Sequence, residues 1–272
     1  MKKISWMALV GMMAFTWSMS AFAVEKIDIQ GSTTVLPIMQ IIAEEFMASH
    51  LEVDITVSGG GSGVGVAALM DSIADIAMSS RKMKDKEMEK AASSGLNIQE
   101  FEIARDAIAV IVNPAQNSLT GIESDILKKI YTGEVKSWRE LGGEDKPIVV
   151  VSRDTNSGTF EVFNEHILKG DELAPEVLLL ASNRAILDEI SKNQDAIGYI
   201  GLGYLNDQVK SLILDGVEPT HDHALDGSYP ISRSLYLYTA NLPTDAKKQL
   251  IDFVLSEKGQ AIVEEEGFVR IK

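Results

Sequence analysis

Hydrophobic positions along the chain switch repeatedly between a period of two residues and a period of three to four. Residues 27–29 (IDI) and 53–57 (VDITV) alternate apolar and polar side chains, which is typical of half-buried strands. Between them, apolar side chains recur at helical spacing over residues 38–46, and residues 244–266 predict a C-terminal helix. Strands that alternate with helices in this way predict an α/β fold with a mixed, mostly parallel sheet flanked by helices.

Two extended apolar segments suggest how the chain divides into domains. Residues 103–112 (IARDAIAVIV) and 197–205 (IGYIGLGYL) are extended and mainly apolar rather than flexible, and no low-complexity linker interrupts the chain. We expect these segments to pass between two lobes of about 120 residues each. Two such crossings make the first lobe discontinuous, with residues 24–107 and 203–272, and place the second lobe at residues 108–202.

The N-terminus and the composition indicate an exported protein. Residues 1–23 predict a cleaved signal peptide, with two lysines, an apolar run and an A-x-A cleavage site; an uncleaved membrane anchor is the alternative. Removing the two lysines and no acid takes the formal net charge from −15 to −17, which argues against nucleic acid or an anionic membrane as the partner. The chain has no cysteine, so it has neither disulfides nor a lipoprotein anchor. We expect a monomeric periplasmic protein.

A strand, a small polar turn and a helix follow one another at three places. These are residues 27–34 (IDIQGSTT), 55–65 (ITVSGGGSGVG) and 149–159 (VVVSRDTNSGT). The first turn of a helix has free backbone N–H groups and the positive end of the macrodipole, so it stabilises an oxyanion. Ordinary N-capping is the alternative for any one of the motifs. Three of them at the sheet edges of an α/β fold favour a ligand site.

The candidate donors of this anion site are hydroxyl and backbone groups in the three turns. They are Ser32, Thr33 and Thr34 in the first turn, Ser62 in the second, and Ser157, Gly158 and Thr159 in the third. Arg153 ends the strand before the third turn, where its planar guanidinium can make two parallel bonds to an oxyanion. A surface ion pair is the alternative for a lone arginine. The sequence therefore predicts a local anion site in an acidic chain.

Other kinds of site fit the sequence less well. The glycines of residues 58–65 lack the G-x-G-x-x-G spacing, and no G-K-[ST] follows them, which argues against nucleotide binding. Neither Ser62 nor Ser157 lies in a G-x-S-x-G nucleophile elbow. His221 and His223 have no third ligand nearby in sequence, so a solvated loop is favoured over a metal site. We expect no catalysis, no metal and no cofactor.

Four segments carry a resemblance to a known family. Residues 31–37 (GSTTVLP), 58–65 (SGGGSGVG), 74–81 (ADIAMSSR) and 152–160 (SRDTNSGTF) resemble motifs of the phosphate-binding proteins of phosphate-specific ABC transporters, in the same order and spacing. The resemblance extends over nearly the whole mature chain. It implies a two-lobed periplasmic binding protein fold of type II, which closes on one dehydrated phosphate and delivers it to a membrane permease. It also implies that the candidate donors and Arg153 bind phosphate.

One position departs from the family pattern and leaves selectivity open. Where well-known members have an aspartate that accepts the proton of phosphate, this chain has Ser80, followed by Arg81. The Ser80 hydroxyl can donate or accept a hydrogen bond. Asp106, in the first crossing segment, is the candidate replacement acceptor, and a solvated or paired aspartate is the alternative. Phosphate capture is the leading hypothesis; the alternatives are sulfate or molybdate binding, a secreted phosphatase, and an adhesin.

Overall fold

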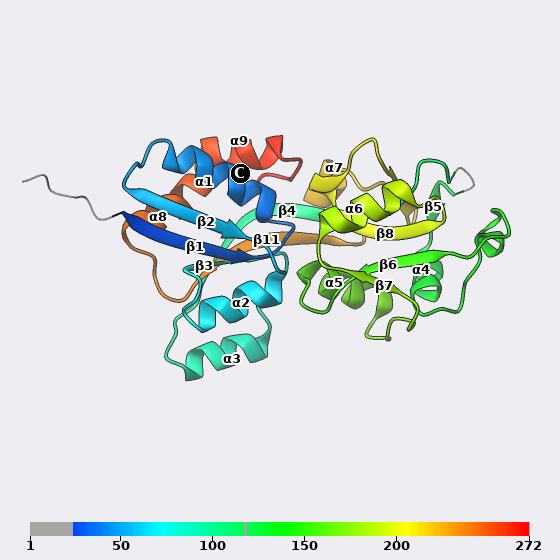
Figure 1. Cartoon of the computed structure of the whole chain (residues 1–272), viewed down its shortest axis with the longest axis horizontal. Helices are drawn as coiled ribbons and strands as arrows, with labels where there is room; N and C mark the ends of the chain where they lie inside the picture. The colour runs from blue at the N-terminus through cyan, green and yellow to red at the C-terminus, as the bar shows by residue number, and fades with distance from the viewer. Residues whose placement is uncertain (1–23, 117–118, 272) are drawn as a thin grey trace, which may run out of the picture.

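The computed structural model describes residues 24–116 and 119–271, so the predicted signal peptide lies outside the described residues. Helices and strands form two groups that lie side by side, and two long strands, β4 and β11, run between them (Figure 1). This arrangement confirms the prediction of a two-lobed α/β fold. In the described part of the chain, no helix is both long enough and apolar enough to cross a bilayer.

The first lobe combines the N-terminal and C-terminal parts of the chain. Its elements are β1 (Glu25–Gly31), α1 (Leu36–Met47), β2 (Val53–Ser58), α2 (Ser62–Met70), β3 (Ile76–Ser79), α3 (Asp85–Ser93), α8 (Asp245–Val254) and α9 (Glu257–Glu265). β1 pairs in parallel with β2 and with β3. Ile27 and Ile29 of β1 are fully buried, as their alternation with polar residues predicts. The predicted helix over residues 244–266 is two helices, because the Ser256 side chain caps α9 by accepting from the Gly259 N–H.

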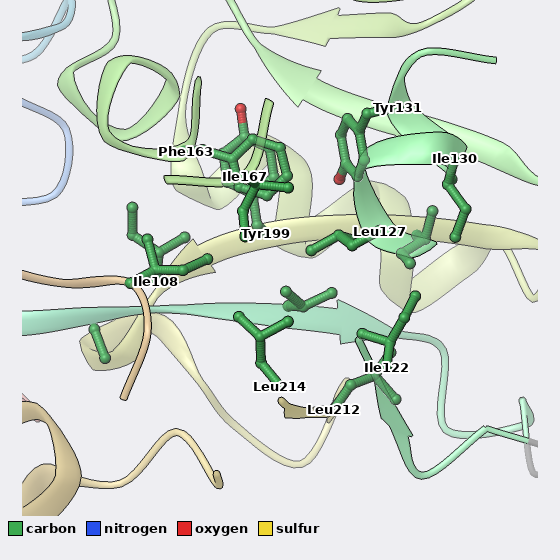
Figure 2. Packing of buried hydrophobic residues seen from close by; sticks show 14 of the residues in the cluster. Ile108, Ile122, Leu127, Ile130, Tyr131, Phe163, Ile167, Tyr199, Leu212 and Leu214 are labelled. Atoms are coloured by element: carbon green, nitrogen blue, oxygen red, sulfur yellow. The ribbon is translucent and has the colours of Figure 1, made fainter. Parts of the chain in front are cut away.

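The second lobe has its own sheet and core. Its elements are β5 (Gly121–Ile122), α4 (Ser124–Tyr131), β6 (Val149–Arg153), α5 (Gly158–Phe163), β7 (Leu178–Leu180), α6 (Asn183–Lys192), β8 (Ala196–Gly201), β9 (Lys210–Ser211), β10 (Ile213–Leu214) and α7 (His221–Leu225). Three aromatic rings pack together inside it (Figure 2). Phe163 stacks on Tyr199 with 4.0 Å between ring centroids, and Tyr131 lies 4.7 Å from Phe163. This packing fixes the base of α5 against the sheet.

Two strands connect the lobes. β4 (Gln99–Val112) pairs with β11 (Ser232–Thr239) over its first half and with β8 over residues 108–112, antiparallel in both cases. β11 also pairs with β3, so hydrogen bonding runs β2-β1-β3-β11-β4-β8-β6-β7 across both lobes. β4 is therefore hydrogen-bonded to strands on the side of both lobes.

The return crossing lies later in the chain than the sequence suggested. Residues 197–205 do not cross: their strand, β8, stays in the second lobe beside β4 and β6. Leu212 and Leu214 belong to the same buried cluster as Ile122 (Figure 2). We therefore place the boundary near residue 231, where β11 begins, and assign residues 203–231 to the second lobe. A strand that is buried on both faces is apolar at every position, whether it passes between lobes or lies inside one lobe. The apolar pattern of residues 197–205 therefore does not distinguish the two arrangements.

Candidate anion-binding site

All ten residues predicted for the site are buried, and they come from both lobes and from the crossing strand between them. Ser32, Thr33 and Thr34 follow β1, Ser62 begins α2, Ser80 follows β3, Asp106 lies on β4, Arg153 ends β6, and Ser157, Gly158 and Thr159 precede or begin α5. The parallel strands β1 and β3 end at the same edge of the first lobe, so the turns after them lie together. Thr159, at the start of α5 in the second lobe, reaches Thr34 of the first lobe at this edge.

Threonine hydroxyls from opposite lobes meet at the centre of the site. The Oγ1 atoms of Thr34 and Thr159 lie 3.1 Å apart. Asn183, at the start of α6, donates from Nδ2 to Thr34 Oγ1 at 2.9 Å and more weakly to Thr33 Oγ1 at 3.4 Å. The Tyr204 hydroxyl donates to the Thr33 carbonyl at 2.6 Å. These bonds join the lobes, so the structure is the closed arrangement.

A second contact between the lobes involves two serines and a glycine. Ser62 Oγ lies 3.3 Å from Ser80 Oγ and accepts the Ser80 N–H at 3.0 Å. Gly158 of the other lobe packs directly on them, because a Cβ there would lie 2.4 Å from Ser62 Oγ and 2.7 Å from Ser80 Oγ. Nearby, the Gly63 N–H at the start of α2 donates to the Asn156 carbonyl at 3.0 Å. Only a residue without a side chain fits at Gly158 in this arrangement.

Two of the predicted hydroxyls also accept hydrogen bonds from nearby backbone N–H groups. Ser32 Oγ accepts the backbone N–H of Thr34 at 3.2 Å, and Ser157 Oγ accepts that of Phe160 at 3.3 Å as the N-cap of α5. Each of these oxygens retains its own hydrogen for a further donation. Ser157 is therefore an N-cap and can still donate to a ligand, whereas Ser32 lies in the turn before α1, whose N-cap is Val35.

Arg153 is a buried cation that has no carboxylate partner in the part of the chain that the structure describes. Its side chain donates from Nε to the Leu180 carbonyl at 3.0 Å and from Nη2 to the Ala181 carbonyl at 2.9 Å, which fixes the guanidinium plane. Within the described residues it forms no salt bridge and Nη1 has no hydrogen-bond partner. Burial lowers the pKa of Arg153, because desolvation penalises its charged form. A fixed, desolvated guanidinium of this kind is stabilised by an anionic ligand.

Asp106 has a different environment from the one expected for a free acceptor. Its Oδ2 accepts from Arg233 Nε at 3.0 Å and Nη2 at 2.7 Å, and its Oδ1 accepts the Leu202 N–H at 2.9 Å. Complete burial raises the pKa of Asp106, while the Arg233 charge and the bonds to backbone N–H groups oppose this shift. These contacts are those of the paired-aspartate alternative, because both carboxylate oxygens accept bonds from the protein.

Three residues of the site were missed in the sequence, namely Arg233, Asn183 and Tyr204. Arg233 is the single charged residue of the stretch 231–239 (ISRSLYLYT), which was the one available signal. Asn183 follows the Ser182 cap of α6 and looks like an ordinary helix start. The Tyr204 pKa is raised to about 12 by burial, so its hydroxyl stays protonated as a donor at neutral pH.

The edge of the site carries ion pairs between the lobes. Arg81 Nε lies 2.7 Å and Lys84 Nζ 2.8 Å from the Glu161 carboxylate on α5. Arg81 is held from its own lobe by a two-pronged pair with Glu87, at 2.8 Å for both bonds. Arg81, Lys84 and Glu161 line a groove of about 940 Å³ that reaches Arg233. Among the described residues, no cluster of three or more histidines and acids could bind a metal ion.

The chain matches a family model over most of its length. A model described as a PBP superfamily domain matches residues 18–258. The phosphate-binding protein PstS of Bacillus subtilis (strain 168) is 34% identical over 248 residues, which cover 90% of this chain and 81% of that protein. PstS of Staphylococcus haemolyticus (strain JCSC1435) is 30% identical over 253 residues, covering 88% and 79%.

Solved structures agree with these matches. One is a crystal structure, with bound phosphate, of a Clostridium perfringens protein described as a phosphate ABC transporter substrate-binding protein. It is 37% identical to this chain with a TM-score of 0.84, and the alignment covers 91% of this chain and all of that one. An ABC-type phosphate transport receptor from Vibrio cholerae is 30% identical with a TM-score of 0.74, covering 89% and 99%. The chain therefore belongs to the PBP superfamily and, within it, to the family of phosphate-binding proteins that includes PstS.

Proposed function

We propose that this protein captures inorganic phosphate between its two lobes and delivers it to the permease of an ABC transporter. The observation that carries the proposal is Arg153: a buried, fixed guanidinium, without a carboxylate partner in the described residues, in a site where hydroxyl donors from both lobes meet. The relatives named above as phosphate-binding proteins support the choice of ligand. Like them, the chain is a binding protein and not an enzyme.

The ten predicted residues line the binding site in this proposal. Arg153 supplies the positive charge, and the hydroxyl and backbone groups of the three turns supply hydrogen bonds to the phosphate oxygens. The Ser62 and Ser80 hydroxyls can accept as well as donate, so they can meet the proton that phosphate keeps at neutral pH. Closure removes water from these contacts, which strengthens each of them.

Export to the periplasm and action as a monomer are further parts of the proposal. Residues 1–23 have the features of a signal peptide, and each lobe buries its own apolar cluster. A protein that presents two closed lobes to a membrane permease must be carried outside the cytoplasm first.

A calorimetric titration of residues 24–272 with phosphate, and separately with sulfate and molybdate, tests the function. We expect one phosphate to bind per chain with a dissociation constant of about 1 μM or lower, since two fixed lobes close on it. If the protein binds sulfate with an affinity equal to or higher than that for phosphate, the proposal that phosphate is its ligand is wrong. No heat with any of the three anions at millimolar concentration would refute the proposal as a whole.

A further inference from the structure

The two crossing strands place a buried pair of charges beside the site. In the antiparallel register of β4 and β11, Arg233 lies directly opposite Asp106. Both side chains are buried, with 3% and 0% of their surfaces exposed. The pair lies where the strands pass from one lobe to the other, so its position is set by the hinge and not by either lobe alone.

Asp106 holds the Arg233 guanidinium in one orientation. Two bonds, of 3.0 Å from Nε and 2.7 Å from Nη2, fix one edge of the planar group. The other edge is directed at the threonines, since Nη1 donates to Thr159 Oγ1 at 3.0 Å and Nη2 donates to Thr34 Oγ1 at 3.2 Å. Arg233 therefore contacts one hydroxyl from each lobe.

These bonds determine where the threonine hydrogens go. Thr34 Oγ1 accepts from Arg233 and from Asn183, which uses both of its lone pairs, so its hydrogen is donated to Thr159 Oγ1 at 3.1 Å. Thr159 Oγ1 then accepts from Thr34 and from Arg233, and its own hydrogen is left to donate outward. The second hydrogen of Arg233 Nη1 also has no partner among the described residues. The Thr159 hydroxyl and the charged Arg233 Nη1 group, which lie 3.0 Å apart, therefore each keep one hydrogen for a further acceptor.

We propose that Arg233 binds the captured anion directly, as a second guanidinium beside Arg153, and that Asp106 is the residue that positions it. This inference rests on the proposed function. Asp106 uses Oδ2 for Arg233 and Oδ1 for the Leu202 N–H, so it serves the arginine and not the ligand. Arg153 and Arg233 bring two positive charges to the site, and Asp106 brings one negative charge that is already paired with Arg233. The site therefore favours the dianion of phosphate over the monoanion.

The test uses a variant that removes both charges of the pair at once. Arg233→Gln combined with Asp106→Asn keeps the net charge and avoids leaving a buried, unpaired carboxylate. Phosphate passes from monoanion to dianion near neutral pH, so affinity is measured near pH 5.5 and near pH 8 for the wild type and the variant. Because the Coulomb energy scales with ligand charge, we expect a loss of about thirtyfold near pH 8 and only about fivefold near pH 5.5. A structural role for Arg233 predicts the same loss at both pH values.

A second variant keeps the inference testable if the double variant does not fold, which circular dichroism and thermal unfolding would show. Arg233→Lys keeps the charge and its partner Asp106 but loses the fork that reaches both threonines, and we expect phosphate affinity to fall by about tenfold or more. Phosphate affinity within about twofold of the wild type for Arg233→Lys, or a pH-independent loss for a folded double variant, overturns the inference. A wild type that binds no phosphate refutes the proposed function instead.

Discussion

Replacing Gly158 by alanine should block lobe closure without damaging either lobe. The added Cβ would lie 2.4 Å from Ser62 Oγ, 2.7 Å from Ser80 Oγ and 3.0 Å from Ser62 Cβ, whereas ordinary contacts begin at 3.4 Å. Rotating Ser62 relieves the first clash but loses its bond from the Ser80 N–H, and the clash with Ser62 Cβ remains. The lobes must therefore stay apart by up to about 1 Å at this point. Overpacking of this size costs about 1 to 3 kcal/mol, so phosphate should bind roughly five- to 150-fold more weakly.

Gly63→Ala provides the matched control in a calorimetric titration with phosphate. Gly63 also faces the opposite lobe, but a Cβ there would meet the Asn156 carbonyl oxygen at 3.4 Å, an ordinary contact. We expect this variant to bind phosphate within about threefold of the wild type, because an alanine is also well tolerated in helix α2. If Gly158→Ala binds phosphate as tightly as Gly63→Ala, the closed packing seen here is not the form that holds the ligand.

Three further predictions concern other contacts of the site. Arg153→Lys should weaken phosphate binding by about 2 to 5 kcal/mol in calorimetry, because lysine keeps the charge but loses the fixed fork; a change under about twofold would remove Arg153 from the site. Glu161→Gln breaks the ion pair with Arg81 between the lobes and should reduce phosphate affinity by about fivefold at low salt, while Glu165→Gln, on the same groove but in no salt bridge among the described residues, should leave it unchanged; equal effects would deny the pair a role in closure. Burial raises the pKa of Tyr204 to about 12, so the stabilisation from its neutral hydroxyl is complete below the unfolded pKa of about 10 and is lost as pH rises through 12. The melting temperature should therefore fall above pH 10, and less so for Tyr204→Phe; an equal fall for that variant would assign the effect to other groups.

The strand, turn and helix motifs of the site could be predicted because each is local in sequence. A β-branched strand, a turn rich in glycine and hydroxyl residues, and a helix start lie within about ten residues of one another, and the physics of N–H groups at a helix start does not depend on distant parts of the chain. Thr34 and Thr159 are such residues, and the structure brings them together across the lobes. The α/β class followed from the same alternation.

The rest of the site depends on pairing between distant segments, which no local pattern encodes. Arg233 meets Asp106 through the register of two strands that lie 127 positions apart in the chain. The lobe boundary was misplaced for the same reason: β8 is apolar on both faces, and only its pairing with β4 shows that it stays in the second lobe. Sequence reasoning recognised Asp106 as unusual, but its partner was visible only in the folded chain.

A crystal structure of residues 24–272 grown with phosphate tests the central claim most directly. We predict a tetrahedral anion between the closed lobes, with its oxygens about 2.7 to 3.1 Å from the Arg153 guanidinium and the Thr159 hydroxyl. An anion bound only in the outer groove beside Arg81 and Lys84, or an interlobe site without phosphate at saturating concentration, would contradict the account.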